Sequence, residues 1–129
     1  QYKKAVEKSR MAEAVTVVKA IAQAQQRYYM INNSYEGING HINEVLDVEL
    51  PSEISCFIWY GENVQKTIRC CKTISKTNTC LYIGRETGRI GSCLVYSADT
   101  TDIPNSLCQK ETGKQTPQNC GSDYCTYNF

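Results

Sequence analysis

The stretch "YKKAVEKSRMAEAVTVVKAIAQAQQRYYMI" (residues 2–31) decides the fold, because it reads as one long helix. Its apolar residues recur at spacings of three and four, which places their side chains along one side of a helix. At about 1.5 Å per residue the helix is roughly 45 Å long. A rod of that length exceeds the width of a small domain, so we expect residues 1–10 to project. The predicted core face comprises Met11, Val15, Val18, Ile21, Ala22, Tyr28 and Tyr29.

Length and charge limit the possibilities. The chain has 129 residues, the size of one domain with a modest core. Its formal net charge of +1 carries no nucleic-acid signature, so no nucleic-acid partner is expected by default. No apolar run reaches the roughly 18 residues of a membrane-spanning helix, and no signal peptide is visible.

Eight cysteines are many for a chain of this length, and their number is even. Their spacing lacks the paired CxxC motifs of a zinc site, so disulfides are favoured over metal ligands or free thiols. Disulfides place the protein in an oxidising compartment. The disulfide candidates are Cys56, Cys70, Cys71, Cys80, Cys93, Cys108, Cys120 and Cys125.

Strand patterns follow the helix. Residues 54–60, 64–73, 80–84 and 92–97 are rich in β-branched and aromatic residues and are joined by short turns, which predicts an antiparallel sheet. The fold class is therefore α+β, with the long helix packed on a four-stranded sheet. We expect a single domain over residues 1–129. Its parts are the helix (1–31), a connecting loop (32–53), the sheet (54–97) and a disulfide-bonded C-terminal loop (98–129), with a short helix near 104–110.

The alternation of side chains along the predicted strands indicates how the cysteines pair. Leu81, Ile83 and Leu94 are assigned to the face covered by the helix, whereas Cys71 and Cys80 point away from it on adjacent strands. Directly opposed residues lie within disulfide reach. The pairs favoured among 105 possible connectivities are Cys56–Cys70, Cys71–Cys80, Cys93–Cys108 and Cys120–Cys125.

The sequence contains little that points to catalysis. No HExxH, GxSxG, P-loop or Rossmann motif is present, and no catalytic, cofactor or metal residues are predicted. His41 next to a cysteine would make a nucleophile pair, but bridged cysteines are favoured. Asp99, Asp102 and Asp123 lie in the C-terminal loop region without the DxDxDG order of an EF-hand, so a solvated acidic loop is favoured over a calcium site.

Two segments of the sequence resemble a known protein family. Residues 1–36 look like the exposed half of the N-terminal helix of bacterial type IV pilins and type II secretion pseudopilins, and "LDVELP" (residues 46–51) is also similar to members of this group. The resemblance implies a helix, a long loop, an antiparallel sheet and a disulfide-closed C-terminal loop. It also implies a very hydrophobic half-helix ahead of residue 1, which would anchor the subunit in the inner membrane before assembly.

The function that the resemblance implies is structural, without catalysis or cofactors. We expect a subunit that polymerises with copies of itself and related pilins into a cell-surface or periplasmic filament for adhesion, motility, DNA uptake or secretion. Two alternatives stay open: a minor pilin or tip subunit that binds a surface, DNA or a secreted substrate, and a small secreted inhibitor, toxin or enzyme. The expected assembly contacts, next to the filament core, are Lys3, Lys4 and Arg10.

Overall fold

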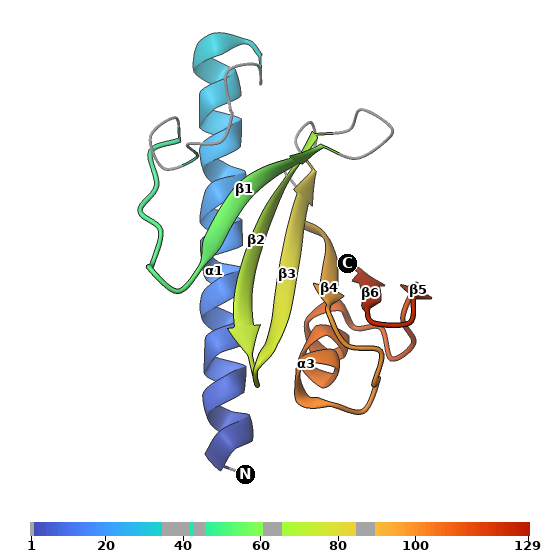
Figure 1. Ribbon diagram of the computed structural model, residues 1–129. Coiled ribbons are helices and arrows are strands. Elements are labelled where there is room, and N and C mark those ends of the chain that lie inside the picture. The colour runs from blue at the N-terminus through green and yellow to red at the C-terminus, as the bar shows by residue number, and fades with distance from the viewer. Residues whose placement is uncertain (1, 35–41, 43–45, 61–65, 85–89) are drawn as a thin grey trace.

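The computed structural model describes residues 2–34, 42, 46–60, 66–84 and 90–129. A long helix comes first, and strands and a short helix follow it (Figure 1). The elements are α1 (Tyr2–Asn32), β1 (Ser55–Tyr60), β2 (Lys66–Ile74), β3 (Thr77–Gly84), β4 (Ile90–Val95), α3 (Ile103–Thr112), β5 (Asn119–Cys120) and β6 (Cys125–Asn128).

The strands form one antiparallel sheet in the order β1-β2-β3-β4-β6-β5. This confirms the α+β class with a long helix on an antiparallel sheet, but the sheet has six strands and the prediction of four was wrong. The two additional strands belong to a short C-terminal hairpin in which β5 is only two residues long. Such a strand is too short to show alternation in the sequence.

Helix α1 runs along one face of the sheet (Figure 1). The side chains of Met11, Val18 and Ile21 are at most 1% exposed and pack against Ile68 and Leu81 of the sheet core. Val15 and Ala22 are buried in the same cluster. Apolar burial of this kind is the main stabilising contribution to such a fold.

The last turns of α1 differ from the prediction. Tyr29 is 41% exposed and is therefore not part of the core, and Tyr28 is only partly buried against it. Met30 and Ile31 are each 83% exposed. Periodicity shows which side of a helix faces the sheet, but it does not show where the sheet ends. Figure 1 shows that the C-terminal turns of α1 extend past the strands.

The prediction that residues 1–10 project is only partly right, because the first turns of α1 extend past the strands (Figure 1) but Glu7 is held against the sheet. Glu7 is 4% exposed, and its carboxylate accepts hydrogen bonds from the Ser75 amide (2.9 Å) and the Arg10 guanidinium (2.8 Å). Ser75 and Lys76 form the turn between β2 and β3 with positive φ angles of 51° and 64°. Such angles strain residues other than glycine, so the Glu7 bond helps to hold this turn.

The face of the sheet that points away from α1 has its own small apolar cluster. Cys71, Cys80 and Leu94 are buried there beneath Tyr82 and Tyr124. The assignment of Leu94 to the helix-covered face was wrong, because Leu94 pairs with Cys80 across β3 and β4 and so shares its face.

The C-terminal region is ordered by helix α3. Asp102 caps the helix by accepting a hydrogen bond from the Asn105 amide, and Gly113 ends it with a φ of 74°. The buried Tyr127 hydroxyl of β6 donates to the Asn105 side chain (2.8 Å) and accepts from Gln109 (2.9 Å). These bonds attach the last strand to α3.

Four disulfides close the strands and the C-terminal region. They are Cys56–Cys70, Cys71–Cys80, Cys93–Cys108 and Cys120–Cys125. These are the four pairs favoured from the sequence, where strand alternation indicated Cys71–Cys80 and Cys56–Cys70 and the other two pairs were assigned from the remaining cysteines. The bridge between Cys93 and Cys108 joins α3 to β4, and the other three each link neighbouring strands.

Candidate functional site

A group of lysines lies where the beginning of α1 meets α3. We define the lysine cluster as Lys4 and Lys8 of α1 together with Lys110 of α3. These side chains line a cavity of about 390 Å³ with Ala5, Ser106 and Leu107. Lys4 and Lys8 are one helical turn apart and therefore share a side of α1. Lys110 stands in the last turn of α3, where a positive charge is favoured by the helix dipole.

The positive charges of the lysine cluster are not neutralised by the described residues around the cavity. The neighbouring Lys8 is the main cause that lowers the pKa of Lys110, and the charge of Lys4 adds to the effect. Glu111 opposes this shift, but none of the described carboxylates lines the cavity. The two ion pairs found among the described residues, Arg10–Glu7 and Lys72–Glu13, lie elsewhere. Three like charges around an open cavity favour an anion from outside the chain.

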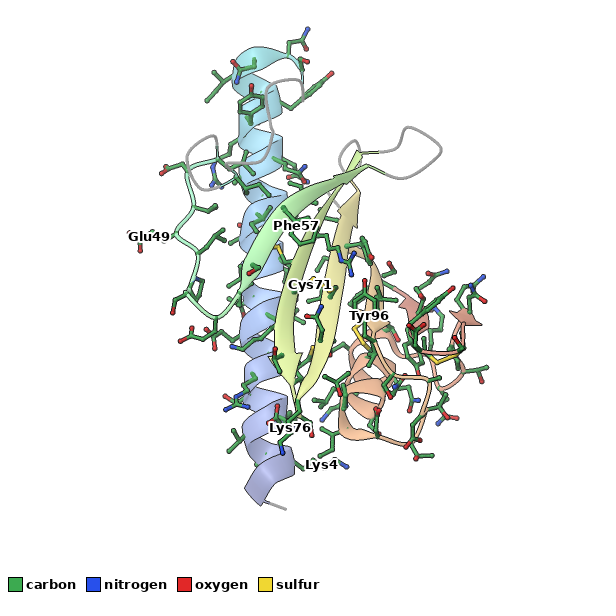
Figure 2. All side chains as sticks on the ribbon, viewed as in Figure 1. Lys4, Glu49, Phe57, Cys71, Lys76 and Tyr96 are labelled. Carbon is green, nitrogen blue, oxygen red and sulfur yellow. A yellow bond between two sulfur atoms is a disulfide. The ribbon has the colours of Figure 1, made fainter. Side chains whose placement is uncertain are left out.

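The predicted assembly contacts occupy different surroundings. Lys4 belongs to the lysine cluster, and Figure 2 shows it at the same end of the molecule as Lys76 of the β2–β3 turn. Arg10 is bonded to the buried Glu7, so part of its role is internal. Lys3 is in α1, but its side chain is outside the described part of the structure.

Sequence reasoning did not single out Lys110, because nothing in its local pattern shows that α3 packs beside α1. A lysine near the end of a short helix is usually explained by the helix dipole alone.

The other candidate groups have structural explanations. All eight cysteines are bridged and therefore offer no thiol nucleophile, and His41 lies outside the described residues. Asp102 caps α3, and Asp99 accepts hydrogen bonds from Thr101, which lower the pKa of its carboxyl group. The described residues contain no group of three or more potential metal ligands. Within that same part of the chain, no helix has the length and hydropathy needed to cross a membrane.

Comparison with known proteins adds one finding. The family described as "Type IV minor pilin ComP, DNA uptake sequence receptor" matches residues 1–53, which include α1 and the segment before β1. Searches of curated proteins and of solved structures find no match. The matched segment contains the helix that packs on the sheet, and the rest of the chain completes a pilin-like α+β architecture with four disulfides. The match and the architecture together support an assignment to the type IV pilin family.

Proposed function

We propose that this protein is a minor subunit of a type IV pilus, which functions by assembling with other pilins and not by catalysis. The observation that carries the proposal is the match of residues 1–53 to a minor pilin family, because these residues form α1 and its connection to the sheet. We also propose that residues 1–129 form one domain. An apolar half-helix ahead of them would anchor the subunit in the inner membrane until it enters the filament.

The lysine cluster is the part of the described surface best suited to an anionic partner. In a filament, the beginning of α1 would lie near other subunits, and carboxylates of those subunits would then neutralise Lys4, Lys8 and Lys110. Opposite charges across an interface mainly set specificity and register. Arg10 and Lys3 would lie at the same boundary, with Arg10 acting partly through its bond to Glu7.

A second candidate function is DNA binding, and the family description favours it, since it names a DNA uptake sequence receptor. Net charge alone predicts no nucleic-acid partner, but local charge can differ from the net value. Phosphates of a DNA backbone would fit three lysines around an open cavity that have no ion-pair partner among the described residues. In this version of the proposal the lysine cluster is exposed on the assembled subunit.

The assembly function is tested in cells that express the protein from its complete gene. Sheared and purified pili should contain the wild-type protein. Lys4→Glu combined with Lys8→Glu should leave folding intact, because both side chains are exposed, while incorporation falls. Lys19→Glu combined with Lys114→Glu is the control of equal charge, placed outside the cluster. Absence of the wild-type protein from pili would refute the proposal.

DNA binding is tested with the purified domain by fluorescence anisotropy on duplex DNA. If three lysines neutralise phosphates, the affinity should fall about 40-fold between 50 and 200 mM salt. Lys8→Gln combined with Lys110→Gln should reduce the salt slope by about two counterions, and Lys19→Gln combined with Lys114→Gln should leave it unchanged. No binding at low salt would refute the DNA function without affecting the pilus assignment. Equal slopes for both variants would place the DNA contact away from the lysine cluster.

A further inference from the structure

The open face of the sheet, on the side away from α1, carries a buried arginine enclosed by aromatic rings. Arg69 of β2 pairs with Phe57 on β1 and with Tyr82 on β3, so the three side chains form a row across the strands. The centre of the guanidinium lies 5.7 Å from the Phe57 ring, 5.3 Å from the Tyr82 ring and 5.2 Å from the Tyr96 ring. In Figure 2, Phe57 lies over β1, and Tyr96 lies across β2 and β3 from it, towards β4.

The charge of Arg69 has no anionic partner among the described residues. The side chain is only 9% exposed, its Nη2 donates to the Tyr96 hydroxyl, and its Nε has no hydrogen-bond partner in the described part of the chain. Contacts with ring faces stabilise a guanidinium by about 0.5–2 kcal/mol. They do not satisfy an N–H donor, and a buried charge without a counter-ion is costly.

Arg69 also lines an open pocket of about 330 Å³, a volume in the range of small-ligand sites. The other polar side chains around it are of mixed character. Ser55, Thr73 and Asn78 offer hydroxyl and amide groups, Glu53 offers a carboxylate, and the Lys72 ammonium is already paired with Glu13. Phe57 lines the pocket and is 38% exposed, so part of an apolar ring faces the opening. The disulfide of Cys71, which also lines the pocket, ties β2 to β3 beneath it.

We propose that this pocket binds an acidic sugar, such as a uronic acid unit of a surface polysaccharide. The sugar carboxylate accepts from Arg69 and supplies the missing counter-charge. Its hydroxyls bond with Ser55, Thr73 and Asn78, and Glu53 accepts from a hydroxyl. The C–H face of the ring packs on Phe57, whose π-face is negative and attracts the slightly positive hydrogens.

The mixture of groups favours an acidic sugar over a nucleotide. Glu53 repels both anions, but a phosphate monoester carries about −1.5 to −2 charge and a uronate only −1, and the ring hydroxyls of the sugar can donate to the Glu53 carboxylate. The inference goes beyond the proposed pilus and DNA functions and uses a different surface from the lysine cluster. Its failure would leave those functions untouched.

The test is a titration of the ¹⁵N-labelled domain with sodium glucuronate, followed by NMR at constant ionic strength. The Arg69 Nε–H resonance should shift in a saturable way, with a Kd of about 1–10 mM. Glucose, which lacks the carboxylate, should bind at least about tenfold more weakly. Phe57→Ala should weaken glucuronate binding by about tenfold, and Phe129→Ala, which removes an equally exposed ring outside the pocket, should not.

Substitution of Arg69 itself could unfold the sheet, so Ser55→Ala, at an exposed position, serves as a second pocket variant and should also weaken binding. An Arg69 resonance that does not move during the titration would overturn the proposal. So would equal affinity for glucose and glucuronate, or tighter binding of thymidine monophosphate, which would indicate a nucleotide site instead.

Discussion

Replacing Glu13 by glutamine tests how α1 is held against the sheet. The Glu13 carboxylate on α1 lies 2.8 Å from the Lys72 ammonium on β2, and this is the ion pair that joins the two elements in the described structure. Lys72 is 6% exposed, whereas Glu13 is 45% exposed. The substitution removes the negative charge with little change of shape, and it leaves the buried ammonium without its counter-ion.

The expected decrease in the free energy of unfolding lies between two limits. Breaking a fully buried pair costs roughly 3–5 kcal/mol, because an unpaired charge remains inside the protein. An exposed pair contributes about 0–1 kcal/mol, since water screens it. Only one partner is buried here, so we expect Glu13→Gln to reduce the free energy of unfolding by about 2 kcal/mol. For a domain of this size the melting temperature should fall by roughly 6–10 °C.

The assay is urea and thermal unfolding of the oxidised domain, monitored by circular dichroism. Lys72→Met should cost less than Glu13→Gln, because it leaves an exposed carboxylate in water and no charge in the interior. In the Lys72→Met background, Glu13→Gln should have almost no further effect. Glu111→Gln, at an exposed carboxylate of α3, is the control and should stay within about 0.5 kcal/mol of wild type. A similarly small effect of Glu13→Gln would refute the placement of α1 on β2.

Three further results are expected. Val18→Asp should unfold the domain because it places a charge in the core. Gln23→Asp, on the exposed side of α1, should change the free energy of unfolding by no more than about 0.5 kcal/mol. Equal effects of the two substitutions would mean that the buried face is assigned wrongly. Reduction of the four bridges should raise the intact mass by about 8 Da, and thiols that titrate in the native protein would contradict the bridges. Replacing both Cys71 and Cys80 by serine should lower the free energy of unfolding by about 2–4 kcal/mol, measured by chemical denaturation. Because the pKa of Lys110 is lowered in the folded protein, the unfolded chain binds more protons between that pKa and the ordinary lysine value of about 10.4. The free energy of unfolding should therefore rise with pH in this window, and Lys110→Gln should abolish that part of the rise.

Most of the fold could be predicted because its signals are local. The helical period of residues 2–31 placed Met11, Val18 and Ile21 in the core, and the structure buries all three. Alternation within β2 and β3 placed Cys71 and Cys80 on the same side, which explains why the bridge pairing could be derived.

Side-chain positions were predicted wrongly where they depend on how one helix or strand is placed relative to another. Alternation fixes which residues of one strand share a face, but it does not fix the register between two strands, and Leu94 was assigned to the wrong side for that reason. Tyr29 continues the helical period beyond the edge of the sheet, where the described core no longer covers it.

The candidate sites were harder to predict than the fold. The lysine cluster joins residues of α1 and α3 that are about a hundred positions apart in the chain, and no local pattern indicates that these helices meet. The enclosure of Arg69 depends on a row across three strands and on Tyr96 beyond a fourth. In the sequence, Arg69 reads only as a charged residue on the exposed side of a strand.

If this chain is a subunit of a type IV pilus, it must be present in the filament. The protein, expressed from its complete gene with a small epitope inserted after Gly113 at the exposed end of α3, should be found by immunogold labelling on intact pili. Labelling should disappear in cells that cannot assemble pili. Gold particles should lie along the filaments or at their tips. A folded, exported protein that is never found on pili would contradict it.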